Sequence, residues 1–371
     1  MKIGCIKEIK KHEYRVGLIP SDVKSYVSRG HQVMIQQGAG DAAGFNDEDY
    51  IRAGASVIKD RKVIFDTCEM IIKVKEPLPE EYGLFREDQI LFTYLHLAAD
   101  KVLTEALIKA GIRGVAYETI EEDEGRLPCL QPMSEIAGRL SIQEGAKYLE
   151  KTFGGRGVLL GGVPGVERGK VGIIGGGVVG TNACKIATGM GAEVTILDIN
   201  AHRLVYLDDI FGSRITALYS TEANIEKVLR ECDLIIGAVL LPGAKAPTLI
   251  KREHLKIMKP GAVIVDVAVD QGGCVETIKP TTHDSPVYVI DNIVHYGVAN
   301  MPGAVALTST KALTSATLPY GLMIAELGLE EACRRSKAVK MGVNLYRGKC
   351  TYENVAKAFN MPYFSVDKLF L

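Results

Sequence analysis

The sequence predicts an α/β protein built on two doubly wound parallel sheets. Short β-branched runs alternate with helical patterns along most of the 371 residues, as they do in parallel α/β folds. A glycine-rich segment at 171–180 joins one such run to a helical pattern, and from Gly303 onward the pattern is helical only. We therefore expect a central domain at 129–304 inserted into a discontinuous outer domain, which 1–128 and the C-terminal helices of 305–371 form together.

The individual elements follow from hydrophobic periodicity and from the residues that interrupt it. In the first segment, strands are expected at 2–6, 31–36, 70–74, 90–95 and 112–116. Ser21 and Asp22 predict the cap of a helix that ends at Gly30, and a second helix is expected at 99–110. In the central domain Ser134 is the expected N-cap of a long helix. Further strands are expected near 171–174, 194–197, 215–218, 233–237 and 262–266, and the longest C-terminal helix at 307–327.

The composition is that of an ordered and nearly neutral protein. Hydrophobic residues make up 47% and charged residues 24% of the chain, which is enough to build buried cores and too apolar for disorder. Lys and Arg number 44 against 45 Asp and Glu, so the basic excess of a nucleic-acid-binding protein is absent.

The cysteines and the apolar stretches indicate where in the cell the protein is expected. The eight cysteines form no Cys-x-x-Cys pair, and we expect reduced thiols in a soluble cytoplasmic protein and no metal site. The N-terminus becomes charged too soon for a secretory signal. The longest uncharged stretch, 292–310, is interrupted by glycine and proline, so no membrane span is expected.

The strongest local signal is a glycine motif directly after an apolar run. Gly175, Gly177 and Gly180 satisfy the pattern Gly-x-Gly-x-x-Gly between an expected strand and an expected helix. The first glycine makes the tight turn, the second lets the backbone approach a pyrophosphate, and the third lets the helix pack on the strand. The structural alternative is a chance glycine-rich turn, but strand, helix and the acid described next together predict a Rossmann dinucleotide site.

That acid is Asp198, which ends the next expected strand 18 residues after Gly180. An acid at this place binds the adenosine ribose and repels a 2′-phosphate, so the sequence predicts NAD rather than NADP. Arg203 stands five residues further on and leaves the strictness of that preference open, because a nearby arginine can accept a 2′-phosphate.

Candidate substrate-binding residues directly follow expected strands. Lys75 and His96 follow consecutive strands, which would place an ammonium and an imidazole at one rim of a parallel sheet. Arg15 follows the first strand and could reach the same rim, and Asp270 lies in a loop of the central domain. Such a set suits a small keto or amino acid: arginine forks a carboxylate, lysine polarises a carbonyl or imine, and histidine exchanges a proton.

Each of these four residues also has a purely structural interpretation. Arg15 taken alone is more often a surface arginine, and Lys75 before Glu76-Pro77 suits a solvated turn. His96 stands between two leucines and suits a core histidine, while Asp270 before Gln-Gly-Gly suits a turn. Spacing alone therefore gives the catalytic interpretation little weight.

Seven ordered motifs, spread over nearly the whole chain, carry a family resemblance. They lie at 7–10 with 13–16, 73–77, 93–98, 131–138, 161–166, 270–273 and 297–302. In these motifs the chain resembles the alanine dehydrogenases of the alanine dehydrogenase/transhydrogenase family, which deaminate L-alanine with NAD. Small departures are the residues 17–20 and Lys279, which stands where the family often has arginine.

The resemblance implies a role for each matching residue. Arg15 and Lys75 would hold the carboxylate and carbonyl oxygen of the substrate, and His96 and Asp270 would form the catalytic acid/base pair. Beyond the glycines, the implied NAD contacts are Ser134, Val178, Val179, Asp198, Arg203, Ser220, Val239, Leu240, Val267, Ala268, Val269, Asp270, Lys279, Val298, Ala299, Asn300 and Met301. The family also implies a homo-oligomer, usually a hexamer.

The implied reaction is the reversible oxidative deamination of L-alanine to pyruvate and ammonia, by hydride transfer from the alpha carbon and hydrolysis of the imine. Two alternatives stay open at this stage. An NAD(H)-binding, transhydrogenase-like subunit would need no histidine at the rim. A dehydrogenase of a larger amino acid, of the opine or saccharopine type, would need a second carboxylate site, and no additional arginine cluster accompanies the motifs.

Overall fold

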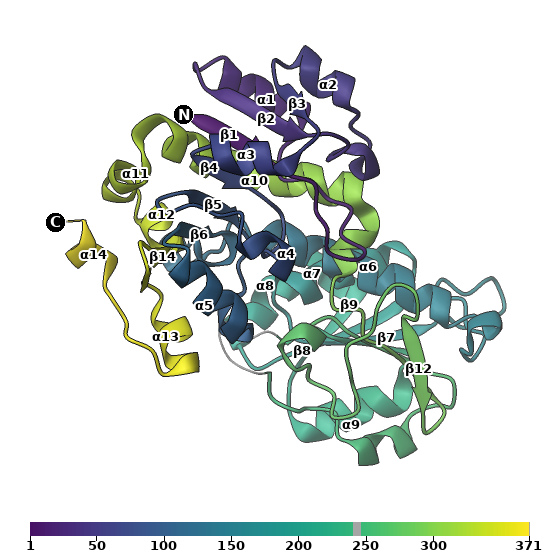
Figure 1. Cartoon of the computed structure of the whole chain (residues 1–371). Coiled ribbons are helices and arrows are strands. Elements are labelled where there is room, and N and C mark those ends of the chain that lie inside the picture. Colours follow the sequence, from purple (N-terminus) through teal and green to yellow (C-terminus); the bar gives the residue numbers. More distant parts are fainter. Residues whose placement is uncertain (240–245, 371) are drawn as a thin grey trace. The chain divides into compact units, whose positions relative to one another are not determined.

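A computed structural model describes residues 1–239 and 246–370 and divides into two compact units (Figure 1). The first unit consists of Met1–Met133 and Gly303–Leu371, and the second unit of Ser134–Pro302. Each unit has helices packed on its own predominantly parallel sheet. The α/β fold class expected from the sequence is therefore confirmed.

In the described part of the first unit, eight strands form a sheet of order β15-β14-β6-β5-β4-β1-β2-β3. Strands β1 to β6 pair in parallel, whereas β14 lies antiparallel to β6. The bounds are β1 (Lys2–Cys5), β2 (Gln32–Gln36), β3 (Ser56–Ile58), β4 (Met70–Ile72), β5 (Ile90–Thr93), β6 (Arg113–Ala116), β14 (Val343–Tyr346) and β15 (Lys349–Cys350). The expectation of helices alone after Gly303 is wrong here, because the wholly buried run of β14 completes the sheet beside β6.

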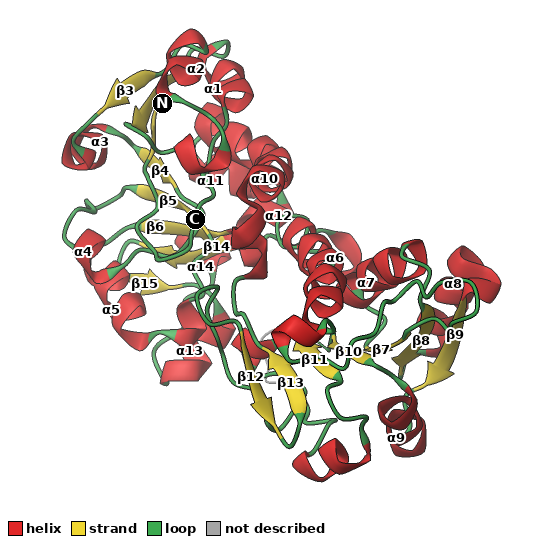
Figure 2. Cartoon of the chain, turned by 90° about the vertical axis from the view of Figure 1, so that its right-hand side faces the viewer, coloured by secondary structure: helices red, strands yellow, loops and turns green. Residues whose placement is uncertain are grey.

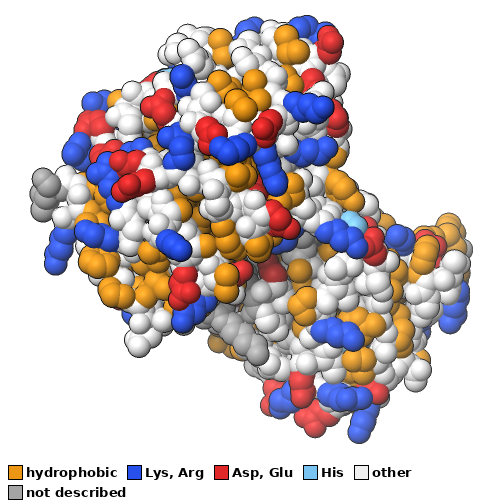
Figure 3. All heavy atoms as spheres, in the orientation of Figure 1, with side chains coloured by type: hydrophobic (Ala, Val, Ile, Leu, Met, Phe, Trp, Pro, Cys, Tyr) orange, Lys and Arg blue, Asp and Glu red, His pale blue; other side chains and the backbone are white. Residues whose placement is uncertain are grey.

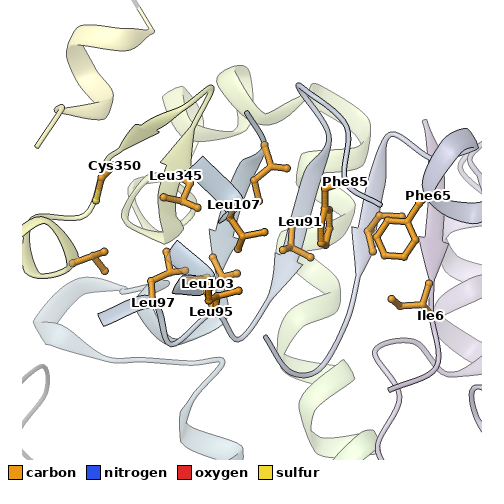
Figure 4. Packing of buried hydrophobic residues seen from close by; sticks show 14 of the residues in the cluster. Ile6, Phe65, Phe85, Leu91, Leu95, Leu97, Leu103, Leu107, Leu345 and Cys350 are labelled. Carbon is orange, nitrogen blue, oxygen red and sulfur yellow. The ribbon is translucent and has the colours of Figure 1, made fainter. Parts of the chain in front are cut away.

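Helices cover both faces of this sheet (Figure 2). On one face, α3 (Arg61–Thr67), α5 (Lys101–Lys109) and α13 (Glu353–Phe359) close a core that includes Phe65, Leu91, Leu107 and Leu345 (Figure 4). On the other face, Gly321 of α10 (Ala306–Leu327) lies against Tyr26 of α1 (Pro20–Val27) and against Phe92. The remaining helices of the unit are α2 (Asp47–Arg52), α4 (Pro79–Tyr82), α11 (Leu329–Arg335), α12 (Lys337–Gly342) and α14 (Val366–Leu369).

In the described part of the second unit, seven strands form a sheet of order β12-β13-β11-β10-β7-β8-β9. All neighbours pair in parallel except β12, which is antiparallel to β13. The chain order reverses between β10 and β7, and ligands of such sheets bind at this switch point. The bounds are β7 (Lys170–Ile174), β8 (Glu193–Asp198), β9 (Ile215–Tyr219), β10 (Leu234–Gly237), β11 (Val263–Asp266), β12 (Val287–Ile290), β13 (Ile293–Tyr296), α6 (Gln131–Tyr148), α7 (Val178–Gly189), α8 (Ala201–Phe211) and α9 (Glu222–Glu231).

Two helix starts differ from the sequence expectation. Helix α1 begins at Pro20 and not after Ser21, because proline suits the first helical position, where no N–H is needed. Asp22 lies inside its first turn, and its carboxylate accepts the N–H of Ile19 at 3.0 Å. Ser134 is not an N-cap, since α6 already begins at Gln131.

The surface and the thiols agree with an ordered, mixed-charge protein. On the face in Figure 3, Lys and Arg side chains are intermixed with Asp and Glu. All eight cysteines are free and buried. Within residues 1–239 and 246–370, no helix is both long and apolar enough to cross a membrane, and no group of three or more His, Cys, Asp or Glu side chains is placed to hold a metal ion.

A buried cluster of charges fixes the chain just after β4. Lys73 is 0% exposed, and its Nζ lies 2.9 Å from Glu81 Oε1 and 3.2 Å from Glu8 Oε2. Burial opposes the charge of Lys73, but Glu8 and Glu81 outweigh it and raise the pKa of this lysine. Glu8 also accepts the N–H of Val74 at 2.6 Å, so the cluster ties the segment after β4 to the loop after β1.

Replacing Lys73 by methionine would leave two carboxylates buried without their cation. We expect the free energy of unfolding at neutral pH to fall by about 3–5 kcal/mol, as measured by urea denaturation followed by circular dichroism. Lys62→Met is the matched control, because the exposed Lys62–Asp66 pair contributes less than about 1 kcal/mol. Equal stability of the two variants would show that the buried cluster is not ionised.

Candidate active site

Three of the predicted site residues lie on loops that leave neighbouring strands of the first unit. Strands β1, β4 and β5 are adjacent and parallel, so their carboxyl ends share one edge of the sheet. Arg15 follows β1, Lys75 follows β4 and His96 follows β5. The structure brings Lys75 Nζ to 3.5 Å from His96 Nε2, which places an ammonium beside an imidazole at this rim.

Arg15 is a buried residue, 3% exposed, and the surface-arginine interpretation is wrong. Its Nε and Nη2 each lie 2.6 Å from a carboxylate oxygen of Glu13, a bidentate pair. Nη1 lies 3.0 Å from Met133 Sδ. Burial opposes the charge of Arg15, but Glu13 outweighs it and the pKa is raised. The guanidinium is therefore held charged and in one orientation.

Lys75 is half-buried at the end of an ordered segment rather than on a solvated turn. Its N–H donates to Glu8 Oε1 at 3.2 Å, and its carbonyl accepts the hydroxyl of Thr93 at 3.1 Å. Burial lowers the pKa of Lys75; Glu76 opposes this shift, and the charge of Arg15 adds to it. The ammonium is thus more acidic than that of an ordinary lysine.

The side chain of His96 is 38% exposed, so the interpretation as a core histidine is wrong. Its backbone is left-handed, with φ 48° and ψ 34°. The ring stacks on Tyr94 with centroids 5.8 Å apart and planes at 14°. Tyr94 is itself fixed, because its hydroxyl donates to the carbonyl of Cys129 at 2.6 Å. A reachable imidazole is therefore presented on a fixed aromatic support.

In the second unit, the glycine motif follows β7 at the switch point of the sheet. Gly175 has φ 103°, and a Cβ there would lie 2.5 Å from the carbonyl oxygen of Ala238. A Cβ on Gly180 would lie 1.8 Å from the carbonyl oxygen of Gly175, so helix α7 requires glycine to approach β7. At Gly177 a Cβ would meet nothing within 4 Å. Packing therefore does not explain Gly177, but open space before the first turn of α7 fits a pyrophosphate.

Asp198 ends β8 and faces this glycine motif. Its Oδ2 accepts the N–H of Gly176 at 2.6 Å, and its Oδ1 accepts that of Asn200 at 2.8 Å. Arg203 donates to the carbonyl of Gly176 and to Thr181 Oγ1, and lies over the ring of Tyr206. These contacts direct the guanidinium of Arg203 at the glycine motif.

Most other predicted cofactor residues follow the carboxyl ends of the same sheet. They are Val178 and Val179 after β7, Ser220 after β9, Val239 after β10, Val267, Ala268 and Val269 after β11, and Val298, Ala299, Asn300 and Met301 after β13. The N–H of Ser220 donates to the carbonyl of Asp198 at 3.0 Å. Leu240 lies outside the described residues.

Ser134 and Lys279 lie beside this edge without following a strand. Ser134 precedes Gly138 by one turn of α6, and a Cβ on Gly138 would lie 2.2 Å from the carbonyl oxygen of Val179. The carbonyl oxygen of Lys279 lies 2.4 Å from where a Cβ of Gly297 would stand. Helix α6 and Lys279 therefore flank the residues after β7 and β13.

Asp270 lies in a 3₁₀ turn, Val269–Gln271, with its side chain exposed. The loop is held by Asp266, which is 0% exposed. Asp266 Oδ1 accepts the N–H of Ala268 at 3.0 Å, and Oδ2 accepts that of Cys274 at 2.8 Å. Burial raises the pKa of Asp266 to about 6. Asp270 is thus both a turn residue and an exposed carboxylate on an anchored loop.

Sequence reasoning missed the carboxylates that hold these loops in place. They are Glu8, Glu13, Glu118 and Asp266. A signal was present for two of them. Glu118 follows β6, the next parallel strand after β5, and Asp266 is the last residue of β11. The rule that singled out Lys75 and His96, a polar residue at the carboxyl end of a strand, applies to both.

The chain matches both domain models of one family. Residues 4–137 match the alanine dehydrogenase/PNT N-terminal domain, and residues 141–353 match the alanine dehydrogenase/PNT C-terminal domain. The chain belongs to the alanine dehydrogenase/PNT family. An alanine dehydrogenase of Methanococcus maripaludis is 57% identical over 369 residues, 99% of each chain. One of Staphylococcus haemolyticus is 54% identical over 368 residues, 99% of this chain and 98% of the relative.

Solved structures agree with membership of the alanine dehydrogenase/PNT family. An L-alanine dehydrogenase superimposes with a TM-score of 0.95 at 54% identity, over 97% of this chain and 99% of the other. A transhydrogenase from Sinorhizobium meliloti gives 0.81 at 23% identity, over 95% and 99% of the two chains. The second structure shares the fold, and of the two the dehydrogenase is the more similar by both measures.

The open space at Gly177 gives a test of the nucleotide site. We expect Gly177→Ala to weaken NADH binding about tenfold or more, because the added methyl occupies the space into which the pyrophosphate would come. Gly189→Ala at the other end of α7 is the matched control, since a Cβ there also meets nothing within 4 Å. NADH fluorescence titration measures both affinities. Equal binding by the two variants would contradict the assignment.

Proposed function

We propose that this chain catalyses the NAD-dependent, reversible oxidative deamination of L-alanine to pyruvate and ammonia. The observation that carries the proposal is the Lys75–His96 contact at 3.5 Å. Buried Arg15 lies in the loop that leaves the same edge of the sheet after β1. A module that only passes hydride between nucleotides does not need this set of side chains. The full-length relatives are named alanine dehydrogenases, and their names favour the same reaction over the opine and saccharopine types.

The rim residues can bind and orient a 2-amino or 2-keto acid. Arg15, whose orientation Glu13 fixes, is proposed to hold the substrate carboxylate, for which a guanidinium fork is suited. Lys75 is proposed to hold the carbonyl oxygen of pyruvate and to stabilise the oxygen-bearing intermediates. Both cationic groups suit the carboxylate that alanine and pyruvate share.

His96 is proposed to move the protons of the reaction. Water attacks the imine carbon after hydride has left the alpha carbon of the substrate, and an imidazole at the rim can accept the proton of that water near neutral pH. Asp270, exposed on its anchored loop, is proposed as the second acid/base group. NAD, when bound, supplies the hydride acceptor, and the glycine motif with Asp198 and the edge residues named above would hold it.

We further propose a homo-oligomer, hexameric as in the family, that acts in the cytoplasm. Leu159, Val163 and Val166 of the second unit are 68%, 53% and 64% exposed, and apolar surface of this kind supports association. Eight free thiols support a reducing compartment. Light scattering after size-exclusion chromatography measures the mass, and a monomer would contradict the assembly.

The test of the reaction is NADH formation by the purified chain with NAD and L-alanine at mildly alkaline pH. D-alanine, L-glutamate and NADP are run in parallel. We expect rapid turnover with L-alanine and NAD only. If the chain binds NADH but turns over no amino acid, the dehydrogenase assignment is wrong and a nucleotide-binding module replaces it.

His96→Ala and Asp270→Ala are expected to lower turnover by at least about a hundredfold, the usual effect of removing an acid/base group. In His96→Ala, NADH binding should stay within about twofold, because His96 is not among the implied nucleotide contacts. Lys62→Met serves again as the control and should turn over normally. Near-normal turnover by either variant would remove that residue from the catalytic assignment.

The lowered pKa of Lys75 predicts a loss of substrate binding on the alkaline side. Because burial lowers this pKa below the ordinary value of 10.5, the ammonium loses its proton at a lower pH than a free lysine does. We expect the Kd of pyruvate for the NADH-loaded enzyme to rise with pH, and to do so at a lower pH than titration of an ordinary lysine would give. In Lys75→Arg the side chain stays charged, so the Kd of pyruvate should no longer rise with pH. NADH fluorescence measures this Kd, and the measurement needs no ammonia.

A further inference from the structure

The backbone of His96 is left-handed and is held in part from outside its own turn. A non-glycine residue with φ 48° sits in a sparsely populated region and persists where surrounding groups enforce it. The support comes from Glu118, in the 3₁₀ turn Tyr117–Thr119 after β6. Its carboxylate accepts the N–H of His96 at 2.6 Å and that of Leu95 at 3.1 and 3.2 Å.

The same carboxylate lies on one side of the imidazole ring. His96 Nδ1 is 4.0 Å from Glu118 Oε1, while Nε2 faces Lys75 Nζ at 3.5 Å. Tyr94 covers one face of the ring. At 4.0 Å the carboxylate is too far for a hydrogen bond to the ring, so its influence on the imidazole runs through the main chain and through its charge.

Glu118 contacts the loop directly at the residue that carries the imidazole. Its side chain is 16% exposed, and its two oxygens take N–H groups from two consecutive residues, the second of which carries the imidazole. Asp100, four residues after His96, carries a carboxylate with a different task. Its Oδ1 accepts the N–H of Leu103 at 3.0 Å and caps helix α5.

We infer that Glu118 is a positioning residue, which holds the left-handed turn at His96 and so aims the imidazole for proton transfer. The inference rests on the proposed function, because it assigns Glu118 a task only if His96 moves protons. Charge-assisted bonds to two successive N–H groups fix both the backbone and the direction in which the side chain leaves it.

The first experiment compares Glu118→Ala, Glu118→Gln and Asp100→Ala with the wild type. We expect kcat for reductive amination of pyruvate to fall about tenfold or more in Glu118→Ala, with Kd for NADH and KM for pyruvate within about twofold. Glu118→Gln keeps one oxygen that can accept the N–H of His96 and should recover part of that loss. Asp100→Ala removes a helix cap and should leave kcat unchanged.

The second experiment is a double-mutant cycle that separates positioning from a merely structural role. In the His96→Ala background, removal of Glu118 should change the residual rate by less than about twofold, because the group on which it acts is gone. A structural role predicts the same fold loss in both backgrounds, and that result would overturn the inference.

The outcomes remain distinguishable from failure of the proposed function. A wild type that turns over no amino acid refutes the function itself. An active wild type with a Glu118→Ala variant of unchanged kcat refutes the positioning role alone. If Glu118→Ala does not fold, as judged by circular dichroism, Glu118→Gln takes its place in the cycle, with the residual loss of kcat expected only where His96 is present.

Discussion

Carboxylates that accept main-chain N–H groups hold the loops of Lys75, His96 and Asp270 and the glycine motif of the second unit. Glu8 binds the N–H groups of Val74 and Lys75, and Glu118 binds those of Leu95 and His96. Asp198 holds the glycine motif, and Asp266 holds the loop of Asp270. A charged acceptor makes a stronger bond than a neutral one, and burial makes its loss costly. The reactive groups can therefore stand on loops and still be held in place.

The predominantly parallel sheets explain why the functional residues gather. Parallel strands send all their carboxyl ends to one edge, so residues distant in sequence meet there without any local motif. In the first unit this brings together the loops after β1, β4 and β5. In the second it brings together the loops after six strands around the switch between β10 and β7. The rule that functional residues follow the carboxyl ends of parallel strands thus accounts for most of the proposed site residues in each unit.

Sequence reasoning reached the fold class, the glycine motif and the residues at strand ends, since these depend on local periodicity and on a turn with fixed steric demands. It did not reach β14, whose four residues become a strand only because β6 offers an edge to pair with. Nor did it reach the burial of Arg15, which depends on Glu13 and Met133. When each residue is interpreted by itself, Arg15 is expected on the surface and His96 in the core. The tertiary structure shows the opposite for both.

The pairing of β14 with β6 has a consequence for the order in which the chain takes shape. Residues 343–346 form an antiparallel strand of a sheet whose parallel strands all lie before residue 117, and the whole second unit is synthesised between them. During translation, the inserted unit has all its strands available while the surrounding sheet still exposes the edge of β6 to solvent. The second unit can therefore complete its sheet during synthesis before the first unit does, and the edge of β6 is the stretch that a chaperone or a premature pairing would meet.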